Sequence, residues 1–181
     1  MEISKLFGLP AHPLLVHVPV VLLPIAIIGA FLMVLSPSWR GRIGWLVVIA
    51  AGVSLLFVQL AIGSGEALEE SVEDSVSSTE ILKSHAHLGE ALRPYAAVFF
   101  VAVLALMLYD RRRARRATAG EPSAIASAAK GTWRDPVMAT VAVIVLVSAV
   151  LSGIWVYRAG HSGAETVWRD THVTGGESGE G

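Results

Sequence analysis

Cysteine is missing from this chain of 181 residues. Its absence excludes disulfide bonds, iron–sulfur clusters, thiolate metal sites, covalently attached c-type haem and a cysteine nucleophile. Charged residues are also scarce: they make up 16% of the sequence, against about 25% in a typical soluble domain. Apolar residues make up 54% and gather in four long runs. The composition therefore indicates an integral membrane protein.

The four apolar runs predict four membrane-spanning helices. Each run has about 20 residues, the length that a helix needs to cross the hydrocarbon core. We predict an all-α, up-down four-helix bundle that forms a single membrane domain over residues 1–181. The predicted spans cover residues 14–35, 43–63, 88–109 and 137–157. No long internal repeat is apparent in the sequence.

The segments outside the spans differ in composition. Residues 64–84 are acidic and carry apolar side chains at helical spacing, which predicts a short amphipathic helix between the second and third spans. Residues 110–136 open with a run of arginines and predict a cytoplasmic loop. Residues 171–181 are rich in glycine and glutamate and predict a disordered tail.

Basic residues predict the orientation of the bundle. The two loops after the first and third spans hold nine lysines and arginines and three acidic residues. The opposite side holds the other five bases and twelve acids. Basic loops stay in the cytoplasm. We therefore expect a multi-pass protein of the inner (plasma) membrane with both termini in the periplasm or outside the cell.

All six histidines fall on the outer side under this topology: His12, His17, His85, His87, His161 and His172. Ionisable side chains at a bilayer boundary are costly and often functional. The first and third spans are diagonal neighbours in an up-down bundle. His17 and His87, at the starts of these spans, are therefore expected to face each other across the interior.

A pair of imidazoles from two helices suits a b-type haem. We predict His17 and His87 as its axial ligands, with His161 as the substitute for either. Such a module would pass electrons to or from a quinone or an extracytoplasmic redox protein. Three further outer-side residues have predicted roles, as acceptor for the His87 ring N–H or as partners of the haem propionates: Glu90, Arg93 and Arg158.

Two alternatives remain open. The first is an outer-face site that binds or senses zinc, copper or nickel, with ligands from His12, His17, His85, His87, His161 and Glu66. The second is a structural or assembly partner without a cofactor, whose histidines simply favour the wet interface; His12, His85 and His172 fit that description best. The sequence also leaves homo-oligomer formation open.

Catalysis and nucleic-acid binding are not indicated. No nucleophile–base pair stands out, so no catalytic residue is predicted and a binding or electron-transfer role is favoured over an enzyme. The run Arg111–Arg116 is expected to determine topology, as basic loops do beside membrane spans. The lipid bilayer is therefore the one partner that the whole chain predicts.

Three motifs resemble one family of bacterial membrane proteins, the domain of unknown function 2231 family. They are His12-Pro13-Leu14-Leu15-Val16-His17-Val18-Pro19, His85-Ala86-His87-Leu88-Gly89 and Gly160-His161-Ser162-Gly163-Ala164. The resemblance covers the whole four-span layout and implies a four-helix inner-membrane domain, sometimes found beside cytochrome-like modules. It implies no established activity, and it supports a redox role by association alone.

Overall fold

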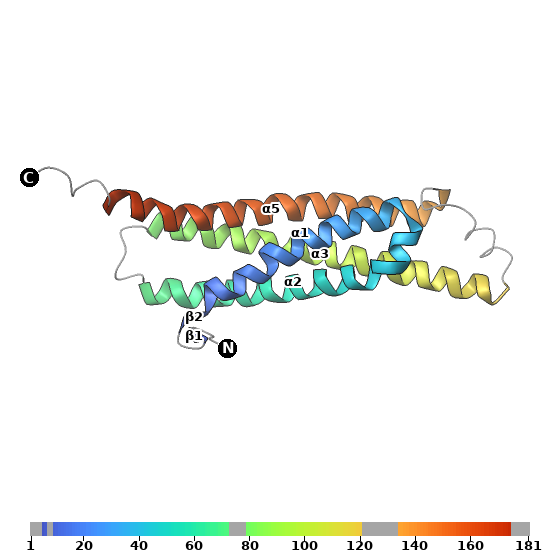
Figure 1. The fold of residues 1–181 in the computed structure, drawn as a ribbon, viewed down its shortest axis with the longest axis horizontal. Coiled ribbons are helices and arrows are strands. Elements are labelled where there is room, and N and C mark those ends of the chain that lie inside the picture. Colours follow the sequence, from blue (N-terminus) through green and yellow to red (C-terminus); the bar gives the residue numbers. More distant parts are fainter. Residues whose placement is uncertain (1–4, 7–8, 73–78, 121–133, 175–181) are drawn as a thin grey trace, which may run out of the picture.

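The structure is a computed structural model that describes residues 5–6, 9–72, 79–120 and 134–174, with side chains over 12–66, 85–120 and 134–164. Its elements in chain order are β1 (Lys5–Leu6), β2 (Leu9–Pro10), α1 (Ala11–Leu35), α2 (Pro37–Val72), α3 (Thr79–Thr118) and α5 (Pro136–Thr174). The two short strands pair antiparallel ahead of α1. Figure 1 shows the four helices lying along one axis.

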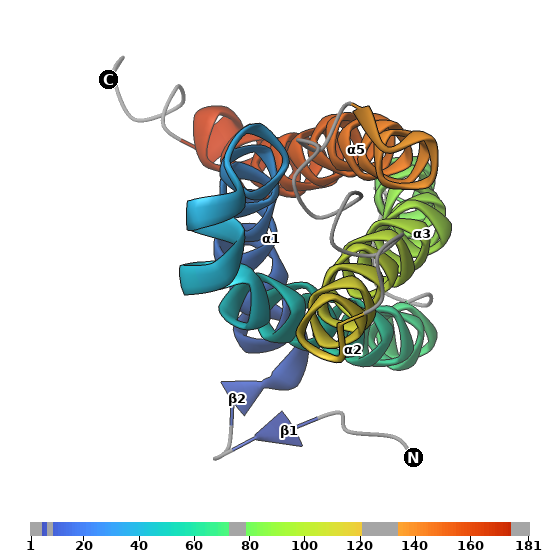
Figure 2. The same cartoon turned by 90° about the vertical axis from the view of Figure 1, so that its right-hand side faces the viewer.

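The helices form a closed ring of four. Extensive contacts join α1 to α2, α2 to α3, α3 to α5 and α5 to α1, and Figure 2 shows the four helices around a common axis. Consecutive helices run in opposite directions, so α1 begins and α5 ends at the same end of the bundle (Figure 1). The predicted four-helix bundle is thus confirmed, with α1 and α3 as diagonal partners.

Four helices in the described part of the chain are long and apolar enough to cross a membrane. Helix α1 is continuous through Pro19 and Pro24. Ser36 alone separates α1 from α2, and its carbonyl accepts the Arg40 N–H at 3.1 Å. Pro37 is the first residue of α2, where its missing N–H costs nothing.

The bundle is lined by small side chains and covered by large apolar ones. Buried positions include many alanines and serines: Ala26, Ala30, Ala51, Ser54, Ala96, Ala102, Ala142, Ala149 and Ser152. Outward-facing positions carry isoleucine, leucine and valine, with Ile28 62% exposed and Leu46 65% exposed. Small residues let membrane helices approach closely, and a soluble protein rarely exposes so much apolar surface. This arrangement is that of a bundle in lipid.

The connecting segments differ from the sequence-based expectations. No separate amphipathic helix occurs in the described part of residues 64–84, which instead extends α2 to Val72 and begins α3 at Thr79. The arginine run expected in a loop belongs to α3, which continues to Thr118. Residues 171–174 of the expected disordered tail are the last turn of α5. The remaining residues of these segments, 73–78, 121–133 and 175–181, lie outside the described part.

Candidate functional site: a pair of histidines from two hairpins

We call the end of the bundle where α1 begins the histidine end, after His12 and His85. His12 lies in the first turn of α1 and reaches the last membrane turns of α2. Its Nδ1 donates a hydrogen bond to the backbone oxygen of Ala61 at 3.0 Å and lies 3.2 Å from Ser64 Oγ. The Ser64 hydroxyl in turn donates to the same Ala61 oxygen at 2.9 Å. One ring nitrogen of His12 is therefore fixed by α2.

His85 makes a matching contact between α3 and α5. Its Nδ1 lies 2.9 Å from Ser162 Oγ. The Ser162 hydroxyl donates to the backbone oxygen of Ala159 at 3.0 Å. The side chains of His85 and Ser162 are both half-buried. Helix α5 thus holds the imidazole of α3 in the way that α2 holds the imidazole of α1.

The two imidazoles meet at the histidine end. Their ring centroids are 6.1 Å apart and their planes are at 89°. Two glycines lie against the rings: a Cβ on Gly65 would be 3.2 Å from His12 Cε1, and one on Gly163 would be 3.0 Å from His85 Cε1. All four helices therefore contribute to one centre, which we call the paired-histidine centre (His12, Ser64, Gly65, His85, Ser162 and Gly163).

This arrangement is suited to metal ligation. Histidine that binds a metal through one ring nitrogen usually donates its other N–H to a carbonyl or another acceptor, which orients the ring. Nδ1 of His12 lies within hydrogen-bond distance of the Ala61 carbonyl, and Nδ1 of His85 within that distance of the Ser162 hydroxyl, a group able to accept. Among the residues that the structure describes, no hydrogen bond engages the Nε2 atom of either ring, so both nitrogens are available to a ligand.

The histidines that sequence patterns favoured as ligands lie elsewhere. His17, His87 and His161 are all exposed on the outside of the bundle. His17 Nδ1 is hydrogen-bonded to the carbonyl of Pro13, within its own helix. The His161 ring stacks on Tyr157 at 5.8 Å, again within one helix. The expectation that His17 and His87 face each other across the interior does not match their exposed positions.

The predicted accessory residues are likewise on the surface: Glu66, Glu90, Arg93 and Arg158. Glu90 does approach His87, as expected for residues one turn apart: its Oε2 lies 3.6 Å from His87 Nδ1, while the His87 side chain is 87% exposed. Arg158 lies over the Trp155 ring at 5.1 Å. The side chain of His172 lies outside the described part.

Sequence reasoning named His12 and His85 among the candidate ligands of the alternative metal site but favoured an interfacial role for both, and it did not identify Ser64 or Ser162. A signal for both serines is present in the sequence. Each stands three residues after an alanine and directly before a glycine, in Ala61–Gly65 and Ala159–Gly163. This shared pattern lies near the end of two separate apolar runs. It would have suggested that the two segments have equivalent positions and contacts in the bundle.

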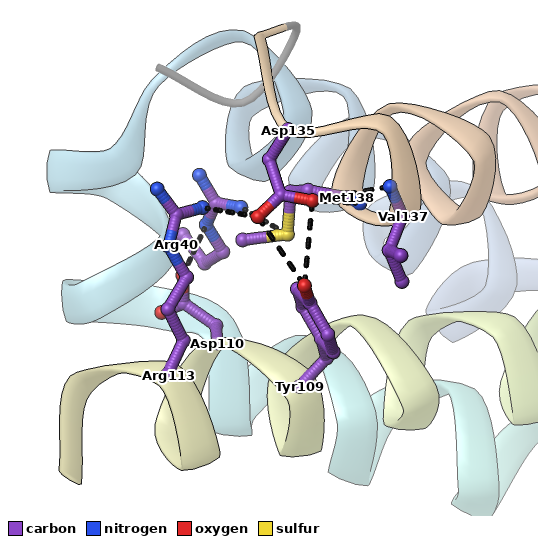
Figure 3. Close-up of polar contacts among 7 residues, drawn as sticks. All are labelled: Arg40, Tyr109, Asp110, Arg113, Asp135, Val137 and Met138. Carbon is purple, nitrogen blue, oxygen red and sulfur yellow. Dashed lines mark hydrogen bonds and ion pairs between the residues drawn. The ribbon is translucent and has the colours of Figure 1, made fainter. Parts of the chain in front are cut away.

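The opposite end, which we call the arginine end, is closed by charged side chains. Figure 3 shows Arg40 of α2 between α3 and α5. Arg40 is only 1% exposed. Its Nε lies 3.7 Å from Asp110 Oδ1, and its Nη1 donates to Met138 Sδ at 3.4 Å. A buried charge needs such partners, because an unpaired one is very costly.

Asp135 is the second organising residue of the arginine end. Its Oδ1 accepts the backbone N–H groups of Val137 and Met138, both at 3.1 Å, and so caps the first turn of α5. Its carboxylate also accepts the Tyr109 hydroxyl, 3.2 Å from Oδ2, and lies 3.5 Å from Arg113 Nη1 (Figure 3). These contacts join α3 to α5, so the role of Asp135 is structural.

Comparison with known proteins supports the resemblance read from the three histidine motifs. Residues 8–175 match a family described as "Predicted membrane protein (DUF2231)". No curated protein and no solved structure matches the chain. In the described part of the chain, no group of three or more histidine, aspartate or glutamate side chains is arranged to hold a metal ion.

Proposed function

The chain belongs to the DUF2231 family of predicted membrane proteins, and we propose that it is a non-catalytic redox module that binds b-type haem through His12 and His85. One observation carries this proposal: two imidazoles from different hairpins lie 6.1 Å apart across the bundle. Each ring has its Nδ1 tied to another helix. The proposal keeps the haem chemistry expected from the sequence and assigns the ligands to His12 and His85 in place of His17 and His87.

The separation of the two rings supports ligation of one iron by both imidazoles. Bonds from a ring nitrogen to a metal are about 2.0 Å long, so two imidazoles that both hold one ion would have ring centres up to roughly 6 Å apart. The observed separation of 6.1 Å agrees with this value. His12 and His85 would be the two protein ligands of a haem iron, whereas an ion such as zinc would need further ligands.

The surrounding residues would hold the two ligands in place. Ser64 and Ser162 orient the rings through Nδ1, and Gly65 and Gly163 leave room for them against α2 and α5. Because α1 and α3 are diagonal partners, the rings approach each other across the bundle axis. When bound, haem would supply one-electron transfer. A quinone or an extracytoplasmic redox protein would be the partner.

The distribution of arginines supports an orientation with the histidine end outside. Basic side chains gather at the arginine end: Arg40, Arg42, Arg111, Arg112, Arg113, Arg115, Arg116 and Arg134. Under the positive-inside rule this end faces the cytoplasm. The paired-histidine centre would then open towards the outer face of the inner membrane, within reach of an extracytoplasmic electron carrier.

Absorption spectroscopy tests the proposal directly. The protein would be produced in cells supplied with a haem precursor and purified in detergent. We expect a Soret band from the wild type, and its loss in His12→Ala and in His85→Ala, because each variant removes one axial ligand. The matched controls are His17→Ala, His87→Ala and His161→Ala. They remove exposed histidines near the same end and should keep the band.

Two outcomes would contradict the proposal. A colourless wild-type preparation would exclude haem as the natural ligand. Elemental analysis of the same sample would then show whether zinc, copper or nickel is bound in its place, which is the metal-ion alternative. Loss of the band in His17→Ala or His87→Ala, with retention in His12→Ala, would show that haem binds at the exposed histidines.

A further inference from the structure

The second helices of the two hairpins, α2 and α5, share one register. Ser64 and Gly65 are followed 98 residues later by Ser162 and Gly163. The same offset relates most of the buried positions of the two helices. These pairs are Arg40 and Met138, Gly44 and Ala142, Val47 and Val145, Ala51 and Ala149, Ser54 and Ser152, and Val58 and Val156.

The first helices, α1 and α3, share a register as well. His12 and His85 are 73 residues apart, and this offset again superimposes buried positions. These pairs are Leu23 and Ala96, Ala26 and Phe99, Ala30 and Val103, Met33 and Leu106, and Val34 and Met107. The two offsets differ because the connection between α3 and α5 is longer than the single residue between α1 and α2.

The apolar position pairs and the polar contacts are not equally strong evidence that the two hairpins are related. Any two helices that face the axis of a bundle repeat buried positions at helical spacing, so the apolar pairs alone prove little. The polar contacts are more specific. In each hairpin a histidine at the start of the first helix contacts a serine near the end of the second. Each serine then donates to the carbonyl three residues earlier. In these contacts and in their buried positions the two hairpins match, as they would about a pseudo-two-fold axis along the bundle.

The contacts of His12 define its protonation. A backbone carbonyl only accepts hydrogen bonds. Because Nδ1 of His12 lies 3.0 Å from the Ala61 oxygen, the proton of the neutral ring must be on Nδ1. Neutral imidazole carries one N–H, so Nε2 then has a free electron pair. Ser64 Oγ, which donates its proton to the same carbonyl, can also accept from Nδ1.

The contacts of His85 lead to the same tautomer. A serine hydroxyl has a single proton to donate. Ser162 Oγ lies 3.0 Å from the Ala159 oxygen and 2.9 Å from His85 Nδ1; because the carbonyl can only accept, a hydroxyl that donates to it is left to accept from Nδ1. In that arrangement Nδ1 of His85 carries the proton and Nε2 has the free electron pair, as in His12. The two half-sites are chemically equivalent as well as structurally related.

We infer that Ser64 and Ser162 are a matched pair of positioning residues, which hold both imidazoles as the Nδ1–H tautomer and so offer two Nε2 electron pairs to one ligand on the pseudo-two-fold axis. The ligand class is a Lewis acid, a metal centre that accepts both electron pairs. Its identity as haem iron rests on the proposed function. The inference about the serines rests on the hydrogen bonds alone.

Nitrogen-15 NMR of histidine side chains tests the inference on the full-length protein, purified without added haem or metal. The wild type should show Nδ1–H for both His12 and His85, assigned with His12→Asn and His85→Asn. Ser162→Ala removes the hydroxyl that lies 2.9 Å from His85 Nδ1. We expect the ratio of the Nδ1–H form to the Nε2–H form of His85 to fall roughly fivefold, the change that one hydrogen bond of ordinary strength produces. His12 should be unchanged in this variant.

The companion variants separate positioning from folding. Ser162→Thr keeps the hydroxyl and should restore the His85 signal of the wild type. Ser64→Ala should move His12 less than Ser162→Ala moves His85, since the Ala61 carbonyl remains as an acceptor. If Ser162 had only a structural role, Ser162→Ala would lower the stability of the protein and leave the tautomer ratio of His85 unchanged.

The results also distinguish this inference from the proposed function. Nε2–H signals for either histidine in the wild type, or an unchanged His85 ratio in Ser162→Ala, would overturn the inference even if haem binds. Nδ1–H signals for both histidines in a protein that binds no porphyrin would support the inference and overturn the haem proposal. In that case titration with Cu⁺ and Zn²⁺ would identify the metal.

Discussion

Two glycines control how closely the imidazoles can sit against α2 and α5. A Cβ on Gly163 would lie 3.0 Å from His85 Cε1, closer than side chains normally pack. Gly163→Ala should therefore displace the His85 ring from Ser162. Changes to the residues that orient a metal ligand usually weaken binding 10- to 100-fold. We expect haem affinity to fall by roughly tenfold, measured by titration of the purified protein with haem.

Gly160→Ala is the matched control for Gly163→Ala. It lies one turn earlier in α5, and a Cβ there would meet nothing within 4 Å. Alanine favours a helix over glycine by about 1 kcal/mol, so this variant should be slightly more stable and bind haem normally. Equal haem affinity in Gly160→Ala and Gly163→Ala would show that the His85 ring is not held against α5 as described.

At the scale of single elements, the start of α5 depends on Asp135. Its carboxylate caps two backbone N–H groups and accepts the Tyr109 hydroxyl. Asp135→Ala removes the cap, which costs about 0.5–2 kcal/mol at a helix start, and also leaves Arg113 without its 3.5 Å ion-pair partner. We expect a loss of about 2–3 kcal/mol in unfolding free energy, measured by denaturant titration in detergent.

Tyr109→Phe separates the parts of this effect. It deletes the hydroxyl that contacts Asp135 and leaves the helix cap and the Arg113 pair in place. A single hydrogen bond contributes about 0.5–1.5 kcal/mol, so this loss should be the smaller one. The paired-histidine centre is at the other end of the bundle, and both variants should bind haem like the wild type. A lower haem affinity in either would mean that the two ends are coupled.

The helices themselves could be predicted from the sequence, but their ends could not. Apolar runs set the four spans, because the bilayer requires about 20 apolar residues per helix. Beyond the spans the sequence is polar, and polarity does not distinguish a loop from a helix that continues into water. The arginines after Tyr109 illustrate this. They were expected in a loop, yet α3 continues to Thr118, with Arg113 engaged by Asp135.

The choice of histidines could not be predicted because it depends on which face of each helix turns inward. A helix rotates about 100° per residue. His17 lies five residues after His12 and therefore points about 140° away, and His87 lies two residues after His85 and points about 160° away. In each motif one histidine faces the bundle and one faces out. The sequence was enough to predict that the histidines gather at one end of the bundle. Identifying the ones that face inward required the packing of the helices.

At the scale of the whole molecule, the pseudo-two-fold arrangement relates the fold to the site. The two hairpins are not obviously similar in sequence, because lipid-facing positions tolerate any large apolar residue and obscure the match. What they share is confined to the axis: a histidine, a serine, a glycine and small buried residues. A centre between two equivalent hairpins has ligands that are already matched in distance and chemistry.

The orientation of the whole bundle is the last prediction, and the absence of cysteine makes it easy to test. Gly41 and Gly63 both lie on α2, both are exposed, and a Cβ at either would meet nothing within 4 Å. They are 22 residues apart, which is roughly 33 Å along a helix, about the thickness of the hydrocarbon core. Single cysteines at these positions therefore report the two faces of the membrane.

Arginines concentrate at the end that carries Gly41, so positive-inside sorting places that end in the cytoplasm. In intact cells, Gly63→Cys should react with a membrane-impermeant maleimide and Gly41→Cys should not. After the cells are permeabilised both should react, which controls for burial of either thiol. Labelling of Gly41→Cys alone in intact cells would reverse the orientation. The paired-histidine centre would then face the cytoplasm, and its electron-transfer partner would have to be sought there.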